Sequence, residues 1–288
     1  MSEHYHFELN DIAFQLQEKH DFQWLEELGR VFAVFDQQDS GNISFGVEHR
    51  GERFFVKYAG AQTLNFSGDV QEAVANLKSA VRLYEELHHP SLISLVSHFA
   101  VGTGYVAIYE WFAGESLHPH WSFPPPAKYT HPDSPFFRYR QLSVKQRVES
   151  LDSIYSFHEF VEARGFVAVD FYDGSLLYNF ENKEIRICDI DLYRKRPFVN
   201  TMGRLWGSSR FMAPEEFELG APIDERTNVF TMGATAFALL GGELNRTIER
   251  WEAGEELYRV ALRAVEHDRE KRYQSVKEFT SAWDSAQK

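Results

Sequence analysis

The sequence predicts an α+β fold in which a β-rich first part precedes a mainly helical second part. Between residues 31 and 58, three apolar strand-like runs are joined by short connectors that contain glycine and polar turn formers. One amphipathic helix pattern, over residues 70–87, separates them from two more strand-like runs. Beyond Leu142, the apolar residues recur mostly at helical spacing. The 288 residues suffice for one large domain or for two parts with a core.

The first part is expected to form a five-stranded antiparallel sheet with one helix. Its strands are short apolar runs bounded by turn residues: Val31–Phe35, Ile43–Val47, Arg53–Tyr58, Leu92–Phe99 and Tyr105–Trp111. Asp69 is placed to cap the helix, and Glu72 three residues later completes a capping-box pattern. His89–Pro90 ends the helix, because a residue before proline avoids helical dihedrals. Residues 1–28 have a mixed pattern that favours a partly helical leader packed on this part.

The second part, residues 112–288, opens with a segment, 118–140, that is rich in proline and aromatic residues. This composition predicts a long irregular loop whose aromatic rings need a surface to pack against. Two interpretations stay open: a brace packed on the helical part, or a wall of the site that selects a substrate. Further helices are expected downstream, over Ser143–Val161, Asn228–Leu240, Glu255–His267 and Ser275–Trp283.

The composition narrows the classes of function. A formal net charge of −13 argues against a nucleic-acid or anionic-membrane partner. The single cysteine, Cys188, excludes an internal disulfide framework and a cysteine-rich metal site. The first residues lack a positive segment followed by an apolar run, and no stretch reaches the roughly 18 apolar residues of a membrane span. These features predict a cytoplasmic protein that binds neither nucleic acid nor membrane.

Four short motifs carry the expected chemistry. In chain order, Lys57 lies in F-F-V-K, Asp170 in V-D-F-Y-D-G-S, Asp189 and Asp191 in I-C-D-I-D-L, and Glu215 closes F-M-A-P-E. A phosphoryl-transfer site needs a carboxylate at the acceptor hydroxyl, another on the metal ion and a cation on the nucleotide phosphates. Asp170, Asp189 and Lys57 are candidates for these three charges, and Asp189 follows Asp170 by 19 positions.

These motifs resemble those of the protein-kinase-like superfamily over residues 25–284, and most closely those of bacterial serine/threonine protein kinases. The resemblance implies a two-lobed fold with a β-rich N-lobe over residues 29–111 and a mainly helical C-lobe. It implies ATP and Mg²⁺ (or Mn²⁺) as cofactors and transfer of the γ-phosphate to a hydroxyl, with Asp170 as catalytic base. Asp189 would hold the metal ion, and Lys57 would pair with the nucleotide phosphates.

The resemblance also implies a nucleotide-binding surface. The segment A-I-Y-E-W-F resembles the hinge, so backbone groups from Glu110 to Phe112 would face adenine, with Tyr109 as gatekeeper. The loop before the second strand has a single glycine, as in aminoglycoside phosphotransferases. Its backbone N–H groups would still cradle phosphate, because that contact needs no side chain, at Ser40, Gly41 and Asn42.

Three further assignments follow from the resemblance. Ser175 stands where the family has a metal-binding asparagine, and its hydroxyl would be a weaker ligand. Asp191 replaces a glycine, either as a second metal oxygen or as a turn residue. Arg272, in the last helices, would form a buried ion pair with Glu215.

Several positions depart from the family pattern. Ala80 stands where a helix glutamate would pair with Lys57, and no acidic residue lies within four positions of it. Ala168–Val169 replaces the His-Arg before the catalytic aspartate. Phe55 replaces a small residue over adenine, which would narrow the pocket.

Three functions are therefore compared. The first is a serine/threonine-type protein kinase, whose partners are a nucleotide and a protein substrate. The second is a pseudokinase-type binding or scaffold module with weak or no catalysis, indicated by Ala80, Ser175, Asp191 and Phe55. The third is a small-molecule, aminoglycoside-like phosphotransferase, against which the A-P-E segment argues. The sequence indicates neither the phosphoryl acceptor nor the oligomeric state.

Overall fold

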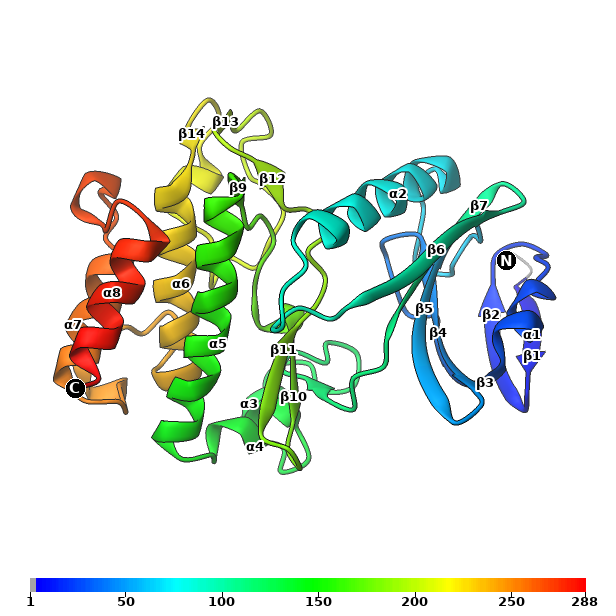
Figure 1. Ribbon diagram of the computed structural model, residues 1–288, viewed down its shortest axis with the longest axis horizontal. Helices are drawn as coiled ribbons and strands as arrows, with labels where there is room; N and C mark the ends of the chain where they lie inside the picture. The colour runs from blue at the N-terminus through cyan, green and yellow to red at the C-terminus, as the bar shows by residue number, and fades with distance from the viewer. Residues whose placement is uncertain (1–3) are drawn as a thin grey trace. The chain divides into compact units, whose positions relative to one another are not determined.

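A computed structural model describes residues 4–288 of the chain (Figure 1). The chain divides into two compact units, a small unit that ends at Phe112 and a large unit that begins at Ala113. Both combine helices with antiparallel strands, which confirms the expected α+β class. The two-lobed kinase arrangement stays a prediction. Within residues 4–288, no helix is both long and apolar enough to cross a membrane.

The small unit contains the expected five-stranded antiparallel sheet, in the order β3-β4-β5-β7-β6 (Figure 1). Its strands are β3 (Arg30–Phe35), β4 (Asn42–His49), β5 (Glu52–Ala59), β6 (Leu95–Val101) and β7 (Gly104–Glu110). The first three form the predicted meander. β6 begins later than expected, because the N–H of Leu92 closes a turn onto the carbonyl of His89 (3.0 Å).

The helix α2 (Val70–Glu86) covers one face of this sheet. Asp69 caps it, as expected, by accepting a hydrogen bond from the N–H of Gln71 (2.8 Å). The ring of Tyr84 lies 4.8 Å from that of Tyr109 on β7, so α2 packs on the face that carries Tyr109. Lys57 pairs with Ala107, two residues from Tyr109, and therefore points to the same face.

The opposite face of the sheet packs against the N-terminal leader. The leader was expected to be mixed and partly helical, and residues 4–28 combine strands with a helix. It forms a hairpin of β1 (Tyr5–Leu9) and β2 (Ile12–Leu16), followed by a short helix α1 (Trp24–Leu28). One core cluster joins leader and sheet, with Phe14, Leu16, Phe22, Leu25, Phe45, Val47 and Val56 among its members. Burial against the sheet selects the strand conformation, since strand preference depends chiefly on packing context.

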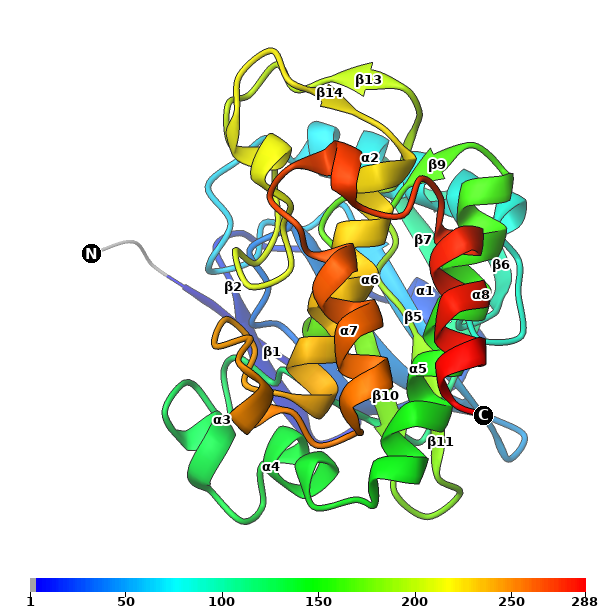
Figure 2. The same ribbon diagram turned by 90° about the vertical axis from the view of Figure 1, so that its left-hand side faces the viewer.

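Four helices form the body of the large unit and pack on one another (Figure 2). They are α5 (Val144–Ala163), α6 (Glu225–Leu240), α7 (Glu255–Ala264) and α8 (Val276–Ala286). The four helices expected beyond Leu142 are therefore present. Ser143 caps α5 through a capping box with Gln146. Nearly every residue of α6 is buried, so α6 is the centre of this core.

The segment 118–140 is not the irregular loop that its prolines indicated. It contains two short helices, α3 (Ala127–Thr130) and α4 (Pro135–Arg140). Ser134 begins α4 by accepting from the N–H of Phe137 (3.4 Å), and Pro135 occupies the first helical position. Proline is compatible with a helix there, because the first N–H of a helix has no intrahelical partner.

Short strands and 3₁₀ turns position the loops of the large unit. The strands form three small antiparallel sheets: β8 (Glu115–Ser116) with β10 (Leu176–Asn179) and β11 (Glu184–Ile187), β9 (Phe166–Val167) with β12 (Arg194–Lys195), and β13 (Phe198–Val199) with β14 (Pro222–Ile223). The 3₁₀ turns are η1 (Asp173–Ser175), η2 (Pro214–Phe217), η3 (Ile248–Arg250) and η4 (Arg269–Lys271).

Candidate functional site

Asp170 follows β9 at a tight turn of the large unit. Its φ is +64°, in the left-handed region that few non-glycine residues occupy. Asn228, fully buried on α6, holds the approach to this turn. Its side chain accepts from the N–H of Ala168 (2.8 Å) and donates to the carbonyl of Phe166 (3.0 Å). Such backbone strain persists only where the surroundings over-determine it, and it is concentrated at functional sites.

The segment that leads into A-P-E lies against the same turn. Gly207 has φ +141°, and a Cβ there would lie 3.1 Å from Met212 and 3.6 Å from the Cα of Asp170. The positive φ favours glycine here, and the segment lies within van der Waals contact of the Asp170 backbone.

The hairpin of β10 and β11 brings Ser175 beside Asp189. Leu176 pairs with Ile187, and the N–H of Cys188 donates to the carbonyl of Ser175 (2.9 Å). Asp189 is exposed and has φ +56°, so its backbone is strained in the same sense as that of Asp170. The Oγ of Ser175 is buried and has no hydrogen-bond partner within residues 4–288.

The charges of Asp170 and Asp189 both act on one tyrosine. Burial raises the pKa of the Tyr172 phenol above its usual value, and the nearby carboxylates of Asp170, Asp189 and Asp173 raise it further. The hydroxyl of Tyr172 therefore stays neutral near pH 7.

Two acidic side chains and one hydroxyl lie in the segments that meet at this end of the hairpin. Mg²⁺ prefers carboxylate and hydroxyl oxygens. Asp189 offers an exposed carboxylate, and the orphaned Oγ of Ser175 lies on the adjacent strand end. Asp191, two residues further, is partly buried. Among residues 4–288, no group of three or more histidine, cysteine or acidic side chains is arranged to hold a metal ion by itself. To be bound here, a metal ion would therefore need the Ser175 hydroxyl or oxygens of a bound ligand in addition to the acidic side chains.

Asp173, in the turn between Asp170 and Ser175, is fully buried and carries an ion network. It accepts from Lys128 of α3, and its two oxygens accept from Arg210 at 2.8 and 2.9 Å. Arg210 also donates to Glu243, just after α6 (2.8 Å). Burial alone would raise the pKa of Asp173, but the hydrogen bonds from Arg210 and the charge of Lys128 outweigh it and hold that pKa below its usual value.

His118 borders this network without adding a charge to it. Its Nδ1 lies 3.9 Å from Asp173, and its ring lies 5.9 Å from that of Tyr172. Burial lowers the pKa of His118 to about 4, against the attraction of Asp173. His118 is therefore neutral near pH 7.

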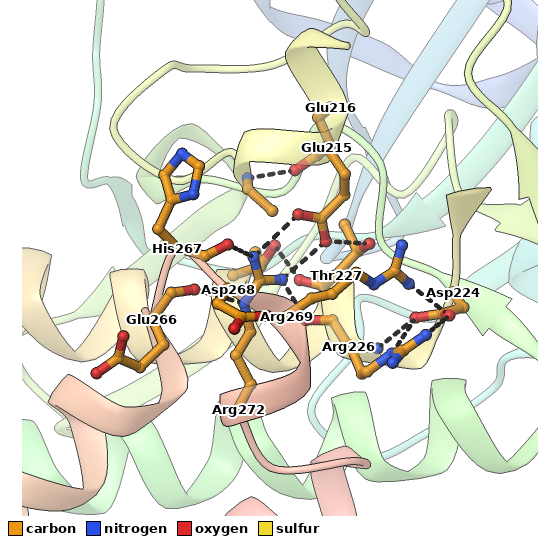
Figure 3. Close-up of polar contacts among 12 residues, drawn as sticks. Glu215, Glu216, Asp224, Arg226, Thr227, Glu266, His267, Asp268, Arg269 and Arg272 are labelled. Atoms are coloured by element: carbon orange, nitrogen blue, oxygen red, sulfur yellow. Dashed lines mark hydrogen bonds and ion pairs between the residues drawn. The ribbon is translucent and has the colours of Figure 1, made fainter. Parts of the chain in front are cut away.

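The predicted ion pair between Glu215 and Arg272 is present, and both side chains are buried (Figure 3). The contact is two-pronged, at 2.8 and 3.0 Å. Thr227 adds a hydrogen bond to the same carboxylate (2.8 Å). Burial would raise the pKa of Glu215, but the hydrogen bonds and charge of Arg272 lower it below its usual value. The prediction from the sequence is confirmed.

The neighbouring Glu216 behaves in the opposite way. Its carboxyl accepts from the N–H of Ala213 (2.6 Å) but contacts no cation among the described residues. Burial raises the pKa of Glu216 to about 8. Near pH 7, Glu216 is therefore mostly protonated while Glu215 is charged.

In the small unit, Lys57 shares its sheet face with Phe55 and Tyr109. Phe55 pairs with Tyr109 across the strands, and their rings lie 6.4 Å apart. The ring of Phe35 lies 5.7 Å from that of Phe55. Ala80, on α2, is fully buried. The face with Lys57 is thus lined by aromatic rings.

The predicted phosphate loop, residues 40–42, is mostly buried. Ser40 is exposed, but Gly41 and Asn42 are buried. A Cβ at Gly41 would meet the ring of Phe66 at 2.7 Å and the Cβ of Ala73 at 2.8 Å. The amide of Asn42 donates to the hydroxyl of Ser40 (3.1 Å).

The predicted hinge residues lie at the end of the small unit. The N–H of Glu110 donates to the carbonyl of Ser94 (2.9 Å), and its carboxylate accepts from the N–H of Ser94 (3.0 Å). The backbone N–H of Glu110 is therefore already hydrogen-bonded to another residue of the small unit. Phe112 is the last residue of the unit.

Comparison with curated proteins relates these features to kinases. The chain is 22% identical over 217 residues to smooth muscle myosin light chain kinase of Gallus gallus, and 24% identical over 225 residues to mitogen-activated protein kinase kinase kinase 1 of Rattus norvegicus. Each match covers 75% of this chain but only 10% and 13%, respectively, of those relatives. No protein-family model matches the chain. This weak similarity supports a relation to the protein-kinase-like superfamily, without singling out bacterial serine/threonine kinases or aminoglycoside phosphotransferases.

Sequence reasoning did not assign Asn228, Lys128 or Arg210. Asn228 lies in a mostly apolar helix, where a buried amide needs a partner, so its polarity was a usable signal. Arg210 directly precedes the apolar F-M-A of F-M-A-P-E. Lys128 lies among prolines and aromatic residues, and no local pattern distinguishes it from an exposed lysine.

Proposed function

We propose that the protein is an ATP-dependent phosphotransferase of the serine/threonine protein kinase type, which moves the γ-phosphate of ATP to a hydroxyl of a protein substrate. The observation that carries this proposal is the pair of aspartates, Asp170 and Asp189, on two turns with positive φ, whose charges both act on Tyr172. Similarity to two protein kinases over three quarters of the chain supports it.

Each residue has a separate role in this proposal. Asp170 orients the acceptor hydroxyl and takes its proton late in the transfer. Asp189, Ser175 and Asp191 would hold Mg²⁺ or Mn²⁺, which supplies neutralising charge on the phosphates. From the small unit, Lys57 would pair with the phosphates.

The remaining nucleotide contacts come from backbone groups of the small unit. Ser40, Gly41 and Asn42 would contact phosphate, and the chain from Glu110 to Phe112 would contact adenine. We place the activity in the cytoplasm.

The first experiment measures thermal unfolding with ATP and Mg²⁺. A ligand that binds only the native state raises the melting temperature. We expect such a rise in the wild type, and Asp189→Asn should remove its metal-dependent part. Transfer of labelled phosphate to a generic basic protein then tests catalysis, and Asp170→Asn should reduce it by orders of magnitude while sparing nucleotide affinity. An unchanged melting curve at millimolar nucleotide would contradict the proposal.

A binding or scaffold module is the second candidate, and one observation favours it. Gly41 and Asn42 are buried, and the ring of Phe66 lies against Gly41, which leaves little exposed backbone to cradle a phosphate. Nucleotide binding without transfer, or neither, would favour this candidate. A small-molecule phosphotransferase is disfavoured by the A-P-E segment with its Arg272 anchor.

A further inference from the structure

Asp173 joins the candidate site to the inserted segment 118–140. It lies three residues after Asp170 and two before Ser175, inside the turn that carries both. Its side chain is fully buried. A buried carboxylate is costly unless it is paired and hydrogen-bonded, so the partners of Asp173 determine whether the turn keeps its shape.

The first partner, Lys128, comes from the inserted segment. Its side chain is fully buried, which is rare for an unpaired lysine. Its Nζ lies 4.2 Å from the ring centre of Phe136 and 5.1 Å from that of Tyr129. These rings exclude water from the contact with Asp173, which strengthens the electrostatic attraction.

The second partner, Arg210, comes from the segment that leads into A-P-E. Its guanidinium bonds both oxygens of Asp173, and one of its nitrogens also bonds Glu243. Tyr129 donates to the same Glu243 (3.0 Å). The network therefore closes a ring that joins the inserted segment, the Asp170 turn, the A-P-E segment and the end of α6.

We propose that Lys128 and Arg210 are positioning residues for the Asp170 turn, acting through Asp173. The effect on catalysis rests on the proposed phosphotransferase function. The effect on the conformation of the turn does not. Asn228 holds the residues before Asp170, and the network holds the residues after it. The inserted segment then helps to position the candidate site, because it supplies one of the two cations that hold Asp173 in place.

A purely stabilising brace is the alternative, and it predicts something different. A brace lowers the melting temperature when it is removed but leaves the turn unchanged in the folded molecule. A positioning role changes the turn in molecules that remain folded. The experiment must therefore be done well below the melting temperature of every variant.

Hydrogen exchange in the full chain tests the positioning role without reference to activity. Lys128→Met removes the cation at nearly constant volume. Lys145→Met is the matched control, since Lys145 is exposed on α5 and lies 3.9 Å from Glu149. In Lys128→Met we expect amides of residues 170–176 to exchange at least about 10-fold faster, with α5 unchanged. The control should alter neither region, and unchanged exchange at 170–176 in folded Lys128→Met overturns the proposal.

Steady-state kinetics form the second arm, and Arg210→Lys supplies a second variant if Lys128→Met does not fold. Arg210→Lys keeps the charge but loses the two-pronged contact. Loss of positioning should lower kcat by about 100-fold in Lys128→Met and about 10-fold in Arg210→Lys, with KM for ATP within about threefold. A kcat within about twofold of wild type in folded variants overturns the catalytic consequence. If the wild type transfers no phosphate, the proposed function fails, and the exchange arm, applied to whichever variant folds, still decides the positioning role.

Discussion

The large unit contains two buried carboxylates held by cations, and they are built differently. Glu215 faces a single guanidinium, that of Arg272, whose five N–H groups are all used: two on Glu215 and the others on the carbonyls of Arg226, Glu266 and His267 (Figure 3). Asp173 instead shares two cations, and Arg210 is itself shared with Glu243.

This difference predicts which property of the protein a substitution in each cluster would change. The Glu215–Arg272 pair is saturated, so its loss strands buried charge at one place and should mainly affect stability. The Asp173 network divides its charge among four segments, so the loss of one member leaves the others partly paired. Such a loss should lower the free energy of unfolding by less, but it should change the conformation of the Asp170 turn.

The largest expected effect is that of Glu215→Ala. Removing one partner of a buried ion pair leaves an uncompensated charge, here Arg272, and typically costs about 3–5 kcal/mol. Chemical denaturation should show this loss in the free energy of unfolding. The substitution alters none of the residues proposed to contact the nucleotide. Glu218→Ala is the matched control, because Glu218 is exposed and should change stability by less than about 0.5 kcal/mol. Equal effects of the two variants would contradict the comparison.

The next effect concerns Glu216, the uncharged neighbour of Glu215. Its pKa is about 8 in the folded chain and near 4.5 when unfolded, so the folded state binds more protons between these values. Stability from this group is full below about pH 4.5 and is lost as pH rises through 8. Glu216→Gln keeps the acceptor for Ala213 and cannot ionise. Its stability relative to wild type should therefore rise by about 3 kcal/mol between pH 5 and pH 8.

Denaturation at several pH values checks this difference. Glu218→Gln serves as the control and should follow the wild type throughout. A Glu216→Gln variant whose advantage does not grow with pH would show that Glu216 is ionised in the folded chain.

The smallest effect is expected within the Asp173 network. Glu243→Gln keeps an oxygen that can accept from Arg210 and Tyr129, and it removes only the charge. We expect a loss of about 1 kcal/mol in the free energy of unfolding. A loss as large as that of Glu215→Ala would show that the network is no more distributed than the simple pair.

Much of the fold followed from local patterns. The turn residues between the first strands, the Asp69 cap and the helical spacing beyond Leu142 each act within a few residues. The Glu215–Arg272 pair was also predicted, although its members lie 57 positions apart, because the resemblance to protein kinases implies it. The leader was less predictable: the hairpin of β1 and β2 is selected by burial of its apolar side chains on the sheet.

By itself, the sequence determined the meander, the capped helices and the order of the acidic motifs, since periodicity and turn chemistry are local properties. Only the tertiary structure decided what holds the Asp170 turn. Lys128 lies 45 positions before Asp173, and Arg210 lies 37 positions after it. Each looks like an ordinary charged residue in its own segment. They become partners because folding buries the carboxylate of Asp173, and a buried charge requires opposite charges from whichever segments the packing brings to it.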